Sequence, residues 1–422
     1  MLDNRLIREE PEKIRRAVEA RSALVDVDRI IALDREMLEN MQAGEKLKHE
    51  RNVKSEEIAE KKRSGETTDD LHAYMKEVSQ QIKQREARDK ELSAELNELL
   101  HVIPNIPHES VPVGKGEEDN VVRSVHGEAP ESFFDVKPHW EIGEDIGVLD
   151  LEAGRKMSGR GFIVFRQDGA LLCRALINLM LDIHREQGYE EVLVPYMVNR
   201  SAMTGTGQLP KFAEDMYHCE IDDLFLIPTS EVPITNIHRE SFLDPAALPI
   251  KHTAYSPCFR REAASYGADT RGLLRIHQFD KVEMVKLVHP DRSYDELESL
   301  LADASAVIEA LELPYRVLEL CTADLGFAAA KCYDLEIYAP GVQKWLEVSS
   351  CSNFEDFQAR RANIRIKKTP GEKYRFVHTL NGSGLALPRI VAGILEVHQT
   401  PTGRVKIPKK LVRYMHGKEY LG

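Results

Sequence analysis

Two long stretches near the start of the chain carry apolar residues at heptad spacing, and they limit the fold more than any other feature. The first stretch, residues 27–63, has its apolar seam at Ile30, Leu33, Met37, Leu47 and Ile58. The second stretch follows a turn at Ser64-Gly65 and has its seam at Leu71, Met75, Val78, Ile82, Leu92, Leu96 and Leu99. Two helices of about 35 residues, each rising about 1.5 Å per residue, would form an arm of roughly 50 Å with too narrow a seam for a globular core. The spacing therefore predicts an antiparallel coiled-coil hairpin over about 27–100.

Polar residues interrupt both seams, and basic residues crowd the distal half of this arm. The interruptions are Asn40, Gly44, Arg51 and Lys54 on the first helix and Arg85 and Asp89 on the second. The basic residues are Lys46, Lys48, Arg51, Lys54, Lys61, Lys62, Arg63, Lys76, Lys83, Arg85, Arg88 and Lys90. Glu residues between them keep the region nearly neutral, so it favours phosphate contacts only modestly. A dimerisation coil or spacer and an arm that touches a nucleic acid both remain open.

Length, composition and net charge exclude several classes of protein. At 422 residues the chain is longer than one typical domain and can bury a sizeable core. A net charge of −13 argues against a protein that coats nucleic acid non-specifically, so any RNA contact must be local. No apolar run approaches about 18 residues, no secretory pattern is visible, and the six cysteines form no CxxC pair. We therefore expect a cytoplasmic protein with reduced thiols, no membrane span and no zinc.

Prolines end the N-terminal part of the chain. Residues 1 to about 24 predict a short helix ahead of the arm. Pro104 and Pro107 end the second arm helix, because proline lacks a donor and disfavours helix at the residue before it. These patterns predict an N-terminal domain over 1–103, followed by an irregular linker over 104–138.

The remainder of the chain, residues 139–422, predicts one α+β domain. Residues 168–187 carry the apolar spacing of an amphipathic helix. Gly188 closes that helix before a strand predicted over 190–195.

A predicted hairpin in this domain gathers charged and aromatic side chains on one face. Residues 253–262 and 273–285 predict two antiparallel strands joined by a polar, mobile loop. Because side chains alternate along a strand, one face offers Arg260, Glu262, Arg275, His277, Phe279, Lys281 and Glu283. A solvated sheet face is also charged, but a phenylalanine in such a row suits a platform for a flat base beside arginines that bind phosphate oxygens in pairs. The residues alone indicate a nucleotide-phosphate site on an antiparallel sheet.

Two shorter clusters place hydroxyls and carboxylates at strand ends. Thr229, Ser230 and Glu231 follow the apolar run LFLI, which suits either a helix N-cap with an acidic first turn or a ligand pocket. A strand predicted from residue 344 ends in Glu347, Ser349 and Ser350. Since Glu347 and Ser350 have opposite parity, Ser350 is predicted to lie at or past the strand end if both face one ligand.

A helix start near the C-terminus carries an arginine where a cation is unfavourable. Residues 381–384 (NGSG) predict a turn, Pro388 suits the first position of a helix, and Arg389 falls in its first turn. The partial positive charge of a helix N-terminus disfavours this cation, so we expect Arg389 to have another partner, for which a phosphate is suitable.

These segments together resemble the class II aminoacyl-tRNA synthetases. FRRE, a Gly-containing loop and RIHQFDKVE are similar to motif 2, and SYGADTRGLLRIHQF is similar to the seryl-tRNA synthetase family in particular. Residues 168–195 resemble motif 1, the dimer interface of that class, and residues 378–396 resemble motif 3, whose arginine contacts ATP. The chain departs from the pattern at Ala264, where many members have Gly, which puts only the flexibility of the loop in doubt.

The resemblance implies an α+β fold with an antiparallel catalytic sheet flanked by helices and an N-terminal arm that holds tRNA. It implies a homodimer that uses ATP and Mg²⁺ to attach L-serine to tRNA(Ser), and also to tRNA(Sec), through seryl-adenylate. The catalytic residues it implies are Arg260, Arg275 and Arg389. The implied ATP contacts are Arg260, Arg261, Glu262, Arg275, Phe279, Glu347, Val348, Ser349, Ser350 and Arg389. The implied serine contacts are Thr229, Ser230, Glu231, Glu283, Asn381 and Ser383, and the implied Mg²⁺ ligands are Glu347 and Ser350.

Three alternatives remain beside this interpretation. Threonyl, prolyl and glycyl enzymes of the same class usually carry a C-terminal anticodon-binding domain, whereas here 33 residues follow Arg389. Truncated seryl-like enzymes that charge carrier proteins lack the arm and use zinc. A catalytically inactive RNA-binding relative would be expected to lose Arg260, Glu283 or Arg389, and all three are present.

Overall fold

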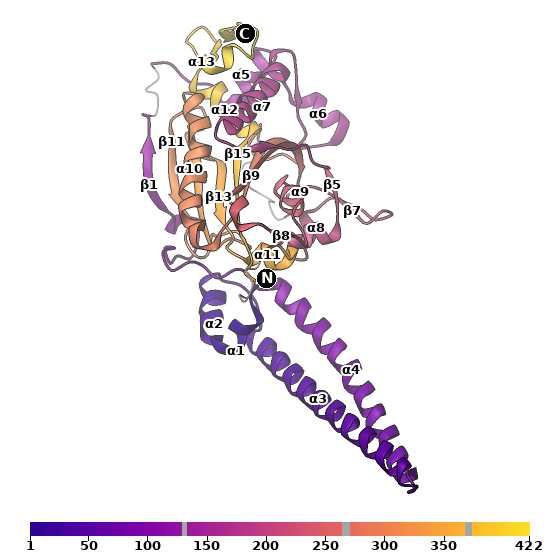
Figure 1. The fold of residues 1–422 in the computed structure, drawn as a ribbon. Coiled ribbons are helices and arrows are strands. Elements are labelled where there is room, and N and C mark those ends of the chain that lie inside the picture. The colour runs from indigo at the N-terminus through magenta and orange to yellow at the C-terminus, as the bar shows by residue number, and fades with distance from the viewer. Residues whose placement is uncertain (129–132, 264–270, 368–373) are drawn as a thin grey trace. The chain divides into compact units, whose positions relative to one another are not determined.

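The computed structural model describes residues 1–128, 133–263, 271–367 and 374–422 (Figure 1). The chain divides into two compact units. One comprises residues 2–19 and 23–103, and the other comprises residues 1, 20–22 and 104–422. Within the described ranges, no helix is both long enough and apolar enough to cross a membrane.

The first unit is helical and contains the arm. Its helices are α1 (Asn4–Glu9), α2 (Pro11–Ala20), α3 (Val27–Arg63) and α4 (Asp69–Val102). The single helix predicted over residues 1–24 is wrong in one respect, because the chain forms two helices that meet at Pro11, which cannot donate an i→i−4 hydrogen bond.

The two arm helices run antiparallel, as Figure 1 shows. Arg88 pairs with Glu36 at 2.6 Å, and Tyr74 donates a hydrogen bond to Glu50, so contacts near the start of one helix meet the end of the other. Buried apolar residues follow the seam, namely Ile30, Leu33 and Ile58 from α3 and Val78, Ile82, Leu92, Leu96 and Leu100 from α4. The predicted coiled-coil hairpin is confirmed.

An eight-stranded sheet organises the second unit. In spatial order its strands are β1 (Val121–His126), β11 (Tyr315–Glu319), β12 (Lys331–Ala339), β13 (Lys344–Asn353), β15 (His378–Ala386), β10 (Gln278–Val288), β9 (Ile250–Phe259) and β4 (Glu190–Glu191). Neighbouring strands are antiparallel except for the parallel pair of β4 and β9. The predicted α+β class with an antiparallel catalytic sheet is confirmed.

Helices and short strands surround this sheet. The helices are α5 (His139–Asp145), α6 (Leu151–Ser158), α7 (Asp168–Glu186), α8 (Arg200–Gly205), α9 (Glu231–Asn236), α10 (Ser293–Ala310), α11 (Phe357–Ala362), α12 (Leu387–Val397) and α13 (Lys409–Val412). The short strands are β2 (Leu149–Asp150), β3 (Val164–Phe165), β5 (Met197–Asn199), β6 (His218–Cys219), β7 (Leu224–Leu226), β8 (Phe242–Leu243), β14 (Arg365–Ile366), β16 (Val405–Lys406) and β17 (Tyr420–Leu421).

The main hydrophobic core lies between one face of the sheet and helices α7, α10 and α12. Figure 1 shows α10 lying along the strands. On β10, Val282 and Met284 point into this core, and both are completely buried. Because side chains alternate along a strand, Lys281 and Glu283 project to the opposite face, so the core on one side fixes which side chains remain for a site on the other.

The structure differs from the sequence expectations at several strands. Residues 104–138 were expected to be irregular but contain β1, which pairs with β11 along an otherwise open sheet edge. The strand expected over residues 190–195 is reduced to β4. The turn expected over residues 381–384 is wrong, because these residues lie inside β15. The loop expected between the motif 2 strands, including Ala264, lies mostly outside the described residues.

Candidate active site

A cavity of about 530 Å³ opens on the face of the sheet that carries Lys281 and Glu283. A second cavity, of about 210 Å³, shares several lining residues with it, among them Arg260, Arg275 and Ser383. The two therefore form one connected site. Side chains from α9, β10 and β15 surround one end of this site, and arginines surround the other.

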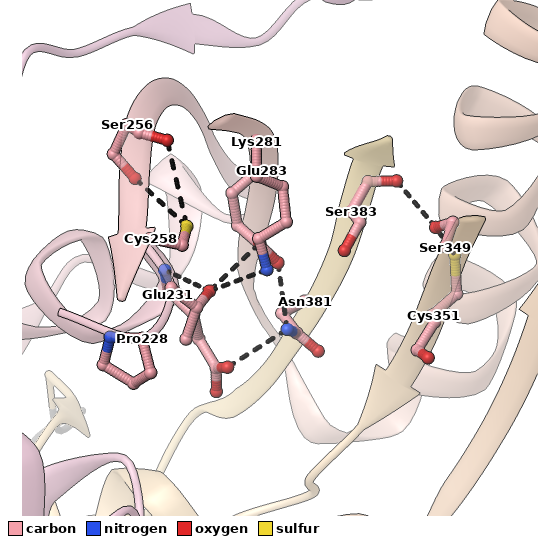
Figure 2. Close-up of polar contacts among 12 residues, drawn as sticks. Pro228, Glu231, Ser256, Cys258, Lys281, Glu283, Ser349, Cys351, Asn381 and Ser383 are labelled. Carbon is pink, nitrogen blue, oxygen red and sulfur yellow. Dashed lines mark hydrogen bonds and ion pairs between the residues drawn. The ribbon is translucent and has the colours of Figure 1, made fainter. Parts of the chain in front are cut away.

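Carboxylate, amide, hydroxyl and ammonium groups converge at the first end, which we call the polar pocket (Figure 2). The Asn381 amide nitrogen lies 3.1 Å from Oε2 of Glu231 and 3.0 Å from Oε1 of Glu283. Oε2 of Glu283 accepts a hydrogen bond from the Thr229 hydroxyl at 3.1 Å. Lys281 forms an ion pair with Glu283 and donates to the Thr229 hydroxyl at 3.0 Å. The pocket thus brings two buried carboxylates and one buried ammonium together.

The polar pocket contains two buried carboxylates, and one of them has a raised pKa. Glu231 is 5% exposed and Glu283 is fully buried. Burial, aided by the neighbouring charge of Glu283, raises the pKa of Glu231 from 4.5 to about 7. Hydrogen bonding from Gln358 and the positive charge of Lys281 oppose this rise without cancelling it. A carboxylate with such a pKa, in a cavity, is a candidate for ligand binding or catalysis.

Arginines and a phenylalanine form the second end. The Arg260 guanidinium lies over the Phe279 ring, 5.1 Å from the ring centroid, and its Nε donates to the carbonyl of Pro228 at 3.3 Å. Arg275 pairs with Glu262 at 2.8 Å. Arg389 extends from the first turn of α12 and donates to the backbone carbonyl of Glu347 at 2.6 Å. Three guanidinium groups around an aromatic platform suit a nucleotide with its phosphates.

Glu347 and Ser350 face the same cavity. The Ser350 hydroxyl donates to Oε1 of Glu347 at 3.1 Å. The register of β13 against β12 shifts between these residues, leaving Val348 as an extra residue, so a bulge reverses the alternation of the side chains. The expectation that Ser350 lies at or past the strand end is therefore wrong, since β13 continues to Asn353.

Two protein-family models and many known proteins match this chain. The model of the seryl-tRNA synthetase N-terminal domain matches residues 1–107, and that of the tRNA synthetase class II core domain (G, H, P, S and T) matches residues 217–398. The serine–tRNA ligase of Caldanaerobacter subterraneus subsp. tengcongensis is 52% identical over 416 residues, which cover 98% of each chain. The chain belongs to the seryl-tRNA synthetase family.

Solved structures of this family have the same fold. A seryl-tRNA synthetase from Pyrococcus horikoshii, complexed with ATP, superposes with a TM-score of 0.96 at 38% identity, covering 100% of this chain and 99% of that one. A cytoplasmic serine–tRNA ligase from Naegleria fowleri, in complex with AMP, superposes with a TM-score of 0.89 at 32% identity, covering 100% of this chain and 98% of that one.

The structure brings most of the residues that the family resemblance implied into the connected site. Those that line it are Thr229, Glu231, Arg260, Glu262, Arg275, Phe279, Glu347, Val348, Ser350, Asn381, Ser383 and Arg389. Glu283 joins them through its bonds to Thr229 and Asn381. Their individual roles in this family member stay predictions.

Besides Glu283, three of the implied residues do not line the connected site. The Ser349 hydroxyl donates to the backbone carbonyl of Ser383 at 2.6 Å (Figure 2). Ser230 is completely buried and lines neither cavity. Arg261 lines a neighbouring cavity together with Arg155 and Arg160, and this cavity shares Glu262 and Arg275 with the connected site. Direct contacts from the Ser349 and Ser230 side chains to ATP or serine would require a rearrangement.

Two residues of the polar pocket were missing from the implied set. Lys281 lies on the same face of β10 as Glu283, so strand alternation alone was sufficient to find it. Gln358 comes from α11 and donates to Oε1 of Glu231 at 2.6 Å, although 127 positions separate the two in the sequence. No local pattern indicates that contact.

Proposed function

We propose that this chain attaches L-serine to tRNA in two steps at the connected site. In the first step, the serine carboxylate attacks the α-phosphorus of ATP, the bond to pyrophosphate breaks, and seryl-adenylate forms. In the second, a terminal ribose hydroxyl of the tRNA attacks the activated carbonyl and AMP leaves. The first step moves no proton, so positioning and charge neutralisation supply most of its rate.

One observation carries the proposal: the polar pocket and the arginine-lined end belong to one connected site. An amino acid in the pocket therefore lies beside a nucleotide at the other end. Arg260 lines both cavities, which suits a contact to the α-phosphate, where the new bond forms.

The arginine-lined end would hold ATP. Arg275 and Arg389 are assigned to the outer phosphates, Phe279 to stacking under adenine, and Glu262 to accepting its amino group. Glu347 and Ser350 would hold Mg²⁺, since their carboxylate and hydroxyl oxygens are hard ligands that lie 3.1 Å apart and line one cavity. When bound, the ion would neutralise charge on the phosphates.

The polar pocket would hold serine. Its proposed contacts are Thr229, Glu231, Glu283, Asn381 and Ser383. A pocket that pairs the serine hydroxyl leaves its own buried polar groups unpaired when alanine binds, so discrimination on the order of 10⁴-fold is expected. Threonine must be excluded sterically, because its hydroxyl satisfies the same groups.

The proposal assigns the arm to tRNA binding. The family match of the N-terminal domain and the basic residues of α3 and α4 support it. Recognition through an arm rather than the anticodon would allow tRNA(Sec) to be charged as well as tRNA(Ser). We further propose a cytoplasmic homodimer, with α7 and the following strand at the dimer interface.

Amino-acid-dependent ATP–pyrophosphate exchange tests the proposal. Purified protein would be assayed with each of the twenty amino acids, with and without Mg²⁺. Exchange with serine alone, lost in Arg260→Ala and retained in an exposed control such as Arg35→Ala on α3, is the expected result. Absence of exchange with every amino acid, combined with retained tRNA binding, would instead indicate a binding protein with a synthetase fold.

A further inference from the structure

We propose that His139 is a positioning residue for nucleotide binding, which holds residues 271–275 against helix α12. The proposal rests on the proposed function, because it concerns how the ATP site is built. His139 lies at the start of α5, is fully buried and lines neither cavity of the connected site.

One side of His139 is fixed to the last turn of α12. Oε1 of Glu396 accepts hydrogen bonds from the His139 backbone N–H at 2.9 Å and from its Nδ1 at 2.7 Å. Oε2 of Glu396 accepts from the backbone N–H groups of Gly341 at 2.8 Å and Val342 at 3.2 Å. A carboxylate surrounded by donors in this way accepts from Nδ1, so the network assigns a proton to that nitrogen.

The other side of His139 holds the segment that leads to Arg275. Nε2 of His139 accepts a hydrogen bond from the backbone N–H of Leu273 at 3.0 Å. A backbone N–H can only donate, so Nε2 carries no proton and the ring is neutral. One imidazole therefore joins the end of α12 to the chain just ahead of β10.

The residues before Leu273 also lie against α5. Gly272 has φ +69°, and a Cβ at this position would be 2.4 Å from Nε2 of His139, so the close approach requires glycine. The Arg271 guanidinium lies over the Trp140 ring, 4.8 Å from its centroid. The contact is thus continuous over residues 271–273.

Helix α12 holds this segment from both of its ends. In its first turn, Nε of Arg389 donates to the carbonyl of Leu274 at 3.4 Å. In its last turn, Glu396 reaches Leu273 through His139. Arg275 follows Leu274 directly and lines the connected site. Loss of the hydrogen bond between His139 and Leu273 would therefore shift Arg275 relative to Arg389. The polar pocket is built from other segments and would be unaffected.

Two substitutions of His139 distinguish its hydrogen bond to Glu396 from its hydrogen bond to Leu273. His139→Asn retains an amide N–H at the place of Nδ1 and has no acceptor that reaches Leu273. His139→Gln reaches further and places an amide oxygen near the position of Nε2. In serine-dependent exchange, the Asn variant should raise the KM for ATP about 10-fold, with the KM for serine changed less than about twofold, and the Gln variant should restore most of the ATP KM.

His398→Asn is the matched control. His398 caps the same helix, and its ring bonds to the carbonyl of Leu311 at 3.0 Å, without contact to residues 271–275. It should lower the thermal midpoint without changing the KM for ATP. Gly272→Ala tests the same contact without changing the side chain of His139. The added methyl group would push residues 271–273 away from His139, so this variant should show the same selective loss of ATP affinity.

The outcomes separate this inference from the proposed function. Wild-type protein that fails to exchange refutes the function, and calorimetric titration with ATP then decides the inference by binding alone. Equal effects of the Asn and Gln variants, or a joint rise of both KM values, would overturn it. If neither His139 variant folds, an unchanged ATP affinity in Gly272→Ala overturns it and an ATP-selective loss supports it.

Discussion

The side-chain amide of Gln358 donates a hydrogen bond to Oε1 of Glu231 at 2.6 Å, and both side chains are buried. The carbonyl oxygen of the same amide accepts from the Thr379 hydroxyl at 2.8 Å, which fixes the orientation of the amide. Gln358 thus holds Glu231 in place and favours its charged form, while burial favours its neutral form and raises its pKa to about 7.

Serine affinity should depend on pH through Glu231. Because its pKa is raised to about 7, Glu231 is mostly protonated below that pH and mostly ionised above it. If the ionised form binds the serine ammonium, the KM for serine should rise about 10-fold as the pH falls from about 8 to about 6. Exchange kinetics across this range measure it. The KM for ATP is the internal control, and a flat serine KM in wild type, or an unchanged profile in Glu231→Gln, would contradict the assignment.

Removing Gln358 should shift that profile. The hydrogen bond from Gln358 lowers the pKa of Glu231, so Gln358→Leu should raise this pKa. The pH at the midpoint of the change in the KM for serine should rise accordingly. The substitution should also cost about 1–3 kcal/mol of folding stability, because buried partners lose their hydrogen bonds. Denaturant unfolding measures the second effect. Gln399→Leu, which loses contacts to Lys137 at the surface, is the control and should show neither change.

Local sequence patterns were sufficient to predict the helices whose apolar periodicity and end signals lie within one stretch of the chain. The arm helix predicted over residues 27–63 is observed as Val27–Arg63, since its apolar seam and its Ser64-Gly65 stop lie within the same stretch of sequence. The first-turn position of Arg389 follows in the same way from Pro388 at the helix start.

Strand irregularities and long-range contacts could not be predicted from such local patterns. A bulge at Val348 turns Ser350 toward Glu347, and alternation counted along the sequence cannot include an extra residue. Gly382 suggested a turn, but it lies inside β15, where a Cβ would be 3.1 Å from Sγ of Cys351. This glycine permits a close approach within the sheet and does not reverse the chain, a difference visible only once β13 is placed beside β15.

The Mg²⁺ requirement should distinguish two neighbouring serines. Ser350→Ala removes a hydroxyl beside the Glu347 carboxylate, so exchange should need several-fold more Mg²⁺ for half-maximal rate, about 1–2 kcal/mol of binding free energy. Ser349→Ala is the matched control, since its hydroxyl bonds to the Ser383 carbonyl and lines neither cavity. That variant should lose stability and retain its Mg²⁺ dependence. Equal Mg²⁺ curves for Ser350→Ala and wild type would remove Ser350 from the proposed site.

The arm contains a polar layer around the buried Asn40, and its loss should affect tRNA charging and leave adenylate formation intact. Asn40 is 4% exposed on α3, and its amide donates to the Arg85 carbonyl at 2.9 Å and to the Asp89 carboxylate at 2.6 Å on α4. Arg85 donates back to Asn40 at 2.7 Å. A polar group at a single seam position fixes the register of two helices, since sliding by one turn would leave the buried Asn40 amide without these partners.

Asn40→Ala should therefore loosen the arm by about 1–3 kcal/mol, which faster amide hydrogen exchange along α3 and α4 would reveal. ATP–pyrophosphate exchange should be unchanged, because the connected site contains no arm residue. Serylation of tRNA should show a higher KM for tRNA, since the arm no longer presents its basic residues in one register. Glu39→Ala, at the exposed neighbouring position, is the control. Loss of pyrophosphate exchange in Asn40→Ala would mean that the arm also supports the catalytic unit.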